Sequence, residues 1–387
     1  MKDFDYLIDG EVYFDAACQS LRPRPVIDAI NDYYLKHNSC GERVKYRWGR
    51  ETDALVEDCR EKVLKYLKLK GRRYNVSFTL NTTYGINLIL SQIDTSKFEK
   101  IITSDIEHNS PFLATMAMSE RTGLPREVIE REPDGSINLA GCDFRKAVVV
   151  VNAASNFDGR TLKNLDALNK AVHKAGGILI IDAAQAMAHS AEVLSGIEVD
   201  AICFSAHKMY APSLGVVVWN DSLNEMLLPY WLGGGMVDDV NKDSFLLSSE
   251  RKDHKYTRFE SGLMAWGEIV GLNAALDWLM GVPKKAWQDF HNYYNDLYEF
   301  LANSPKVHLV NNEANPTMSF YVEGVDSHLL GEALSRENIM GRTGYFCAHY
   351  YLDHVLKMPP LMRFSLGLHT KGSDIEKTKK VLSKVLN

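Results

Sequence analysis

Two groups of reactive side chains follow two short apolar runs in the middle of the chain. Asp182 and Gln185 follow the run 178–181, and the run 201–204 is followed by Ser205, His207 and Lys208. A lysine in partly dry surroundings can lose its proton near neutral pH and add to an aldehyde as a Schiff base. The two groups therefore offer an amine nucleophile and a carboxylate to one site.

The apolar runs are the elements that must position these groups. Each run is too short for a helix and rich enough in Ile and Val for a buried parallel strand. Open α/β sheets bind ligands at the carboxyl ends of such strands. Alone, Asp182 would be an ordinary strand-end or helix-capping residue, and Lys208 a surface lysine. Together they suit pyridoxal phosphate, whose ring nitrogen needs a fixed carboxylate to keep its proton.

The same stretch carries a family resemblance. The segments IIDAAQ and FSAHKMYAPSLGVVVW resemble the signature of the class V aminotransferases, pyridoxal phosphate enzymes of fold type I that include the cysteine desulfurases. The resemblance extends from Asp15 to about Asp374. It implies an α/β fold with a mostly parallel seven-stranded sheet. The length of the chain suggests two domains, and the alternation of helices and strands in its C-terminal part places a smaller α+β domain at 261–387, together with 1–14, after a large cofactor-binding domain at 15–260.

Hydrophobic periodicity predicts the other elements of this fold. Strands are expected at 76–80, 100–104 and 147–152, with an antiparallel strand at 214–219 after the lysine. Helices are expected after Pro23 and Pro25, at 53–67, from Thr82, at 162–174 and at 270–280. Further strands are expected in the C-terminal part at 317–322, 340–343 and 362–366.

Several residues outside the central stretch complete the expected cofactor site. Thr82 and Thr83 begin a helix, where backbone N–H groups and the helix dipole favour a phosphate, although threonines there also serve as N-caps. The resemblance places His108 over the cofactor ring as a proton carrier and Asn156 on its phenolic oxygen. It thus implies this cofactor-binding set: Thr82, Thr83, His108, Asn156, Asp182, Gln185, Ser205, His207 and Lys208.

The C-terminal part distinguishes among the reactions of this family. The segment IMGRTGYFCAHYY resembles the Arg-x-Gly-His-His-Cys-Ala motif of group II cysteine desulfurases, and this places Cys347 at their nucleophile. Arg363 matches the arginine that binds the substrate carboxylate, with Asn156 and Ala17 also on the substrate side. The resemblance therefore implies Lys208, Cys347 and His108 as catalytic residues. The alternatives are a small buried side chain for Cys347 and an interdomain ion pair for Arg363.

The chain departs from the family pattern at two places. Tyr345 and Phe346 replace the two histidines before the cysteine, and aromatic residues there are expected to dry the loop and raise the pKa of the thiol. Leu263 replaces a threonine that reaches the phosphate of the neighbouring subunit's cofactor. Arg43 and Arg47 could line the mouth of the site, with Arg43 at the place of a His-Arg-Gly arginine, although solvated surface is the usual role for such residues.

Composition limits the classes of function. The 387 residues are 45% hydrophobic and 24% charged, with a net charge of −6, so neither nucleic acid nor an anionic membrane is expected as the main partner. We expect no signal peptide and no membrane span. The six cysteines are scattered, which argues against a metal site and a disulfide framework. A reducing cytoplasm fits this pattern.

The sequence thus predicts a homodimeric cysteine desulfurase that uses pyridoxal phosphate. It would convert L-cysteine to L-alanine, hold a persulfide on Cys347 and pass the sulfur to an acceptor protein. Three alternatives stay open. Another class V reaction (aminotransferase, epimerase or β-lyase) would not need Cys347 as a nucleophile, a selenocysteine lyase would share nearly every residue, and a non-catalytic scaffold would have lost turnover.

Overall fold

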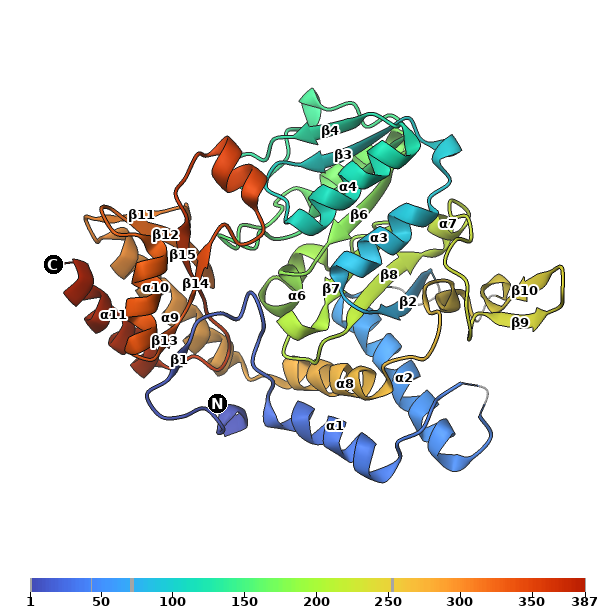
Figure 1. Cartoon of the computed structure of the whole chain (residues 1–387), viewed down its shortest axis with the longest axis horizontal. Coiled ribbons are helices and arrows are strands. Elements are labelled where there is room, and N and C mark those ends of the chain that lie inside the picture. Colours follow the sequence, from blue (N-terminus) through green and yellow to red (C-terminus); the bar gives the residue numbers. More distant parts are fainter. Residues whose placement is uncertain (1, 43, 70–72, 252–253, 387) are drawn as a thin grey trace.

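The computed structural model describes residues 2–42, 44–69, 73–251 and 254–386. Arg43, one of the two arginines considered for the mouth of the site, lies outside these ranges. The described chain builds a seven-stranded sheet and a separate four-stranded sheet, each with its own helices (Figure 1). Among the described residues, every helix is too short or too polar to cross a lipid bilayer.

The large sheet confirms the predicted mostly parallel arrangement. Its strands lie in the order β2-β8-β7-β6-β5-β3-β4, and β8 runs antiparallel to both of its neighbours, β2 and β7. The strands from β3 to β7 pair in parallel. Their bounds are β2 Tyr74–Thr79, β3 Lys100–Ser104, β4 Arg126–Ile129, β5 Ala147–Asn152, β6 Ile178–Asp182, β7 Ala201–Ser205 and β8 Gly215–Asn220.

The central strands are apolar throughout because both faces of the sheet are covered. Val148 and Val150 face a core formed with α3 (Thr82–Gln92) and α4 (Asn109–Thr122). Val149 and Val151 face the opposite core, to which the helices α2, α5 and α8 contribute. The helices near this second face are α1 Arg24–Lys36, α2 Arg47–Tyr66, α5 Leu165–Lys174 and α8 Trp266–Gly281. Figure 1 shows α8 running beside α1 and α2.

The four-stranded sheet forms the second part of the molecule (Figure 1). Its antiparallel strands lie in the order β11-β12-β15-β14, with bounds Val307–Leu309, Thr317–Val322, Leu361–Ser365 and Arg342–Gly344. Three long helices accompany it: α9 Lys284–Ala302, α10 Ser327–Arg336 and α11 Gly372–Leu386. Near the N-terminus, β1 (Val12–Tyr13) pairs in parallel with β13 (Ile339–Met340). The proposed domain boundary at 260/261 stays a prediction.

Several elements differ from the expectation. The single strand predicted at 340–343 is two strands, β13 and β14, separated at Gly341, where an added Cβ would collide with the Met362 side chain. The strand β4 and the hairpin β9 (Val237–Val240) and β10 (Phe245–Leu247) were not predicted, since their sequences are polar or interrupted. Two short helices complete the large part, α6 Ala186–His189 and α7 Asp221–Asn224.

Candidate active site

A cavity of about 230 Å³ lies at the carboxyl ends of the parallel strands. All nine residues of the predicted cofactor-binding set line it. Five further residues complete the lining: Asn81, Ser110, Asn152, Ala154 and Ala184. Ala17 lies beside it, in a small adjoining cavity that Gln185 and Lys208 also line. The structure therefore brings these predicted residues together from segments between positions 17 and 208.

Lys208 and Asp182 provide an amine and a carboxylate to this cavity. Lys208 ends a short turn after β7, and burial lowers the pKa of its amine, while the nearby Asp182 carboxylate opposes the shift. Asp182 ends β6, is 5% exposed, and accepts a hydrogen bond at Oδ1 from the Ala184 N–H at 2.9 Å. Burial raises the pKa of the Asp182 carboxyl, so a cationic N–H partner would stabilise its ionised form.

Hydroxyl groups gather at the beginning of α3. The Thr82 N–H donates to Ser205 Oγ at 2.8 Å, the Thr82 and Ser205 hydroxyls are 2.6 Å apart, and Thr83 Oγ1 lies 2.7 Å from Ser110 Oγ. Asn81 is the N-cap, since its side chain accepts from the Tyr84 N–H. The capping role considered for the threonines therefore falls to Asn81. Hydroxyls beside a helix N-terminus form a site suited to a phosphate.

His108 is held as a neutral imidazole. It is the N-cap of α4, and its Nδ1 accepts from the Ser110 N–H at 3.0 Å. The ring proton must therefore lie on Nε2. Burial, and then the charges of Lys208 and Arg363, lower the pKa of His108 to about 3. Near neutral pH this histidine offers an N–H donor at Nε2, while its imidazolium form is scarce.

Asn156 and Gln185 connect the cavity to the surrounding loops. Asn156 Nδ2 donates to the Phe346 carbonyl at 2.6 Å, and its buried Oδ1 has no hydrogen-bond partner within the described part of the chain. Gln185 Nε2 donates to the Ala17 carbonyl at 2.8 Å. Each amide thus fixes a segment beside the cavity, and Asn156 keeps its second N–H for a ligand.

Cys347 lies on a loop that is anchored to the cavity wall. Phe346 and Cys347 both have positive φ, 50° and 59°, and the Cys347 carbonyl accepts from the Asn109 N–H at 2.6 Å. The Cys347 side chain is exposed, and Cys18 and Cys347 are both among the groups whose charge opposes the lowered pKa of the Lys208 amine. The aromatic residues do build an apolar cluster, since Phe346 is buried there with its ring 4.8 Å from the Arg363 guanidinium, and the Tyr345 hydroxyl donates to the Met358 carbonyl at 3.2 Å. The cluster does not cover the thiol of Cys347, which differs from the expected dry surroundings.

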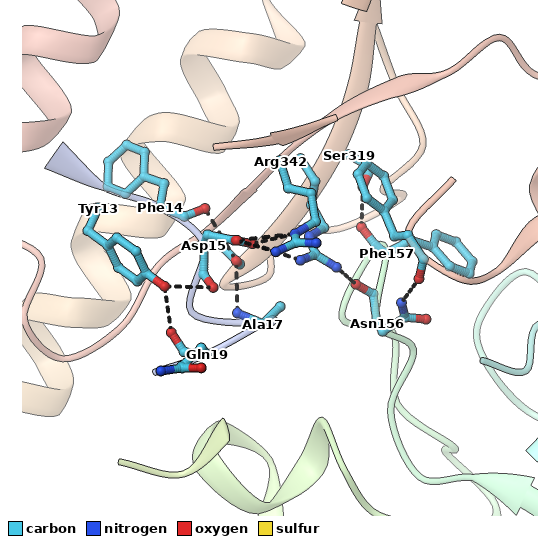
Figure 2. Close-up of polar contacts among 12 residues, drawn as sticks. Tyr13, Phe14, Asp15, Ala17, Gln19, Asn156, Phe157, Ser319 and Arg342 are labelled. Atoms are coloured by element: carbon cyan, nitrogen blue, oxygen red, sulfur yellow. Dashed lines mark hydrogen bonds and ion pairs between the residues drawn. The ribbon is translucent and has the colours of Figure 1, made fainter. Parts of the chain in front are cut away.

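Arg363 is almost completely buried, at 2% exposed, on β15. Its Nη1 donates to the Asn156 carbonyl at 2.8 Å, and its Nη2 to Asp15 Oδ1 at 3.0 Å. Arg342 contacts the same carboxylate, as Figure 2 shows. The sequence does not indicate a pair of Asp15 and Arg342, because 327 positions separate them. Arg363 is therefore part of a charged cluster at the edge of the site, which the ion-pair alternative had anticipated.

Other lining residues were also missed. Asn81, Ser110 and Asn152 carry no sequence motif of their own. Asn152 ends β5, as Asp182 ends β6, so its position at a carboxyl strand end was the signal available. Arg47 is an exposed residue that pairs with Glu51, which fits the surface role. The described residues contain no group of three or more His, Cys, Asp and Glu side chains placed to hold a metal ion.

The arrangement of donors and acceptors fits pyridoxal phosphate. The cavity has a hydroxyl-rich helix N-terminus for a phosphate, a buried carboxylate for a ring N–H, and an amine of lowered pKa for an aldehyde. Asn156 has an amide N–H and a buried unpartnered oxygen for the polar edge of a ligand. The residues of the cavity therefore offer a suitable partner to the phosphate, the ring nitrogen and the aldehyde of this cofactor.

Known proteins resemble the chain over its whole length. A "Probable cysteine desulfurase" of Chlamydia muridarum is 30% identical over 95% of this chain and 92% of its own. One of Vibrio cholerae is 26% identical over 95% of this chain and 91% of its own. The apo structure of a cysteine desulfurase from Thermococcus onnurineus superimposes with a TM-score of 0.88 at 26% identity, covering 97% of this chain and 94% of that one. The profile of the family "Aminotransferase class-V" matches residues 12–378, and the chain belongs to that family.

Proposed function

We propose that the protein is a pyridoxal-phosphate-dependent cysteine desulfurase that converts L-cysteine to L-alanine and retains the sulfur as a persulfide on Cys347. One observation carries the proposal: an exposed cysteine thiol lies on a loop that Asn109 and Asn156 anchor beside a cavity with the donors and acceptors that the cofactor needs. The full-length similarity to proteins named cysteine desulfurases supports it.

Different residues of the cavity would bind different parts of the cofactor. Pyridoxal phosphate, when bound, would withdraw electrons from the substrate's α-carbon. Lys208 would hold its aldehyde carbon, Asp182 would keep the proton on its ring nitrogen, and His108 would lie against its ring. The phosphate would be held by residues around the beginning of α3 and the turn after β7: Thr82, Thr83, Ser205 and His207.

Two residues would move protons. Lys208 would act as the base, since burial lowers the pKa of its amine and so favours the neutral form. It would take the proton from the α-carbon and return it later. His108 would contribute the N–H at Nε2, since its Nδ1 is committed to Ser110.

The sulfur step requires Cys347. Its thiolate would attack the substrate sulfur, forming an S–S bond while the bond between that sulfur and Cβ breaks. The electron pair of the broken bond stays with the substrate, whose Cβ takes up a proton to give alanine. The sulfur remains on Cys347 as a persulfide. Because the side chain is exposed, a sulfur-acceptor protein could approach it directly.

Arg363 and Asn156 would orient the substrate, with Ala17 beside them. A planar guanidinium binds a carboxylate through two parallel hydrogen bonds. The buried Nε of Arg363 has no hydrogen-bond partner among the described residues and can donate to the substrate. The backbone of Ala17 is fixed by Ser365 Oγ at 2.9 Å and by Gln185.

We also propose a homodimer in a reducing compartment. Large apolar side chains of the segment 228–263 are exposed, including Tyr230 at 68% and Leu263 at 78%. Apolar groups so exposed are suited to a subunit interface. Leu263, which replaces the expected threonine, would contribute packing there rather than a phosphate contact. The six cysteines are scattered along the sequence without close pairs, which fits a reducing compartment. Light scattering on the purified protein measures the subunit number.

The test is a single turnover with L-cysteine, followed by quantification of alanine and by the mass of the Cys347 peptide. Alanine together with one added sulfur on that peptide supports the proposal. Cys347→Ser should abolish both and keep the visible absorbance of the lysine-bound cofactor. Cys40→Ser is the matched control, since Cys40 is also exposed but does not lie on the loop that Asn109 and Asn156 anchor beside the cavity.

The alternatives give other results. If Cys347→Ser turns over normally, the enzyme runs another class V reaction, and other amino acids should be screened. Faster turnover of L-selenocysteine that survives this substitution would indicate a selenocysteine lyase. A purified protein without cofactor absorbance, even after incubation with pyridoxal phosphate, would indicate a scaffold.

A further inference from the structure

Two arginines of the small sheet face each other at the edge of the active site. Arg342 on β14 and Arg363 on β15 are direct cross-strand partners in an antiparallel pair. Like charges in this position repel each other and destabilise a sheet. Asp15 lies between them: Arg342 Nε is 3.1 Å from each carboxylate oxygen and its Nη2 2.8 Å from Oδ2, while Arg363 Nη2 is 3.0 Å from Oδ1.

The backbone fixes Asp15 in this position from both sides. The Ser365 N–H donates to the Phe14 carbonyl at 2.8 Å, and the Ala16 N–H donates to the Ser365 carbonyl at 3.1 Å. The N-terminal segment is thereby attached to the end of β15, and Figure 2 shows the Asp15 carboxylate directed at Arg342. The Asp15 side chain is only 17% exposed, so solvent screens the cluster weakly.

The charges of the cluster leave one positive unit. Two guanidinium groups and one carboxylate sum to +1, and the unpartnered Nε of the buried Arg363 is a donor that needs an acceptor. The α-carboxylate of an amino acid carries one negative unit. Substrate and product of the proposed reaction share this carboxylate, so stronger attraction would bind both equally. Such uniform binding does not accelerate chemistry and slows release of the product.

We propose that Asp15 is a positioning residue that keeps the net charge of the carboxylate site at +1. At this charge the site binds the α-carboxylate of the substrate but still releases the product, which carries the same carboxylate. This inference rests on the proposed role of Arg363 in substrate binding. It does not depend on the fate of the sulfur. Its observable consequence is that the affinity for an amino-acid carboxylate follows the net charge of the cluster.

The test is calorimetric titration of the holoenzyme with L-alanine. Asp15→Asn keeps the shape of the side chain and one acceptor oxygen but raises the net charge of the cluster to +2. The Kd should then fall about tenfold, since the added charge attracts the carboxylate and solvent offsets most of that attraction. Arg342→Gln lowers the cluster to zero, so the Kd should rise about tenfold. The double variant returns the cluster to +1 and should restore the Kd to within about threefold of the starting value.

A purely structural role predicts a different pattern. If Asp15 only anchors Arg363, Asp15→Asn weakens L-alanine binding and the double variant weakens it further, which overturns the proposal. An unchanged Kd in both single variants overturns it as well. Should Asp15→Asn fail to fold, Arg342→Gln tests the same charge balance from a residue whose side chain is 43% exposed. If the desulfurase proposal alone is wrong, the affinity pattern persists while no persulfide forms.

Discussion

Replacing Arg363 by lysine keeps the charge of the proposed carboxylate site but removes its planar fork. The guanidinium already uses Nη1 on the Asn156 carbonyl and Nη2 on Asp15, which leaves Nε and the remaining N–H groups for the substrate. A lysine ammonium also has three N–H donors, but they lie on one compact atom and do not reproduce the planar fork that reaches these separate partners. The loss of one charge-assisted hydrogen bond costs about 1.5–3 kcal/mol, which corresponds to a KM for L-cysteine raised about 10- to 150-fold.

The assay is the initial rate of alanine formation over a range of L-cysteine concentrations. The kcat should change much less than KM, because the carboxylate is bound both before and during the reaction. Arg342→Lys is the matched control: it keeps the charge at a half-exposed residue, and its KM should stay within about threefold of the unsubstituted enzyme. Thermal unfolding of both variants monitors the fold. A KM for Arg363→Lys within about threefold would refute the role of this arginine.

Two predictions concern stability. Glu260→Gln leaves the buried Arg60 without its bidentate carboxylate, so the free energy of unfolding in urea should fall by about 3–5 kcal/mol. Glu57→Gln removes an exposed partner of the same arginine and should lower it by under about 1 kcal/mol. Equal losses in the two variants would contradict this prediction. The hydrogen bond to Asp200 raises the pKa of His173. The pair therefore stabilises the folded state fully below about pH 6.5, and this stabilisation is lost as the pH rises through the raised pKa. His173→Gln should therefore lower the unfolding midpoint more at acidic than at alkaline pH, and an equal loss at both would count against it.

The central part of the fold and of the site was predictable because local signals coincide there. The runs that became β6 and β7 are apolar at every position; Asp182 follows the first directly, and Lys208 comes four residues after the second. Parallel strands end at one edge of a sheet, so the neighbourhood of these two side chains follows from the pattern alone. The resemblance to class V aminotransferases added Thr82, His108 and Asn156, which the structure brings to the same cavity.

The remaining features depend on contacts between distant segments. Asp15 reads as part of an ordinary turn until the fold places it between two arginines more than three hundred positions away. Phe346 replaces a histidine, and the sequence could not show that its ring covers Arg363 and leaves Cys347 exposed. The strand β4 has a polar sequence and pairs with β3 only because the sheet has a free edge there. Tertiary packing decided each of these cases.

The central claim is that Cys347 accepts sulfur at a lysine-bound cofactor site, and mass spectrometry of the Cys347 peptide after one turnover with L-cysteine tests it most directly. The expected result is one added sulfur on Cys347, in amounts equal to the alanine formed, with no added sulfur on the peptide of the half-buried Cys18. Alanine formed in full amount while the Cys347 peptide keeps its original mass would contradict the claim.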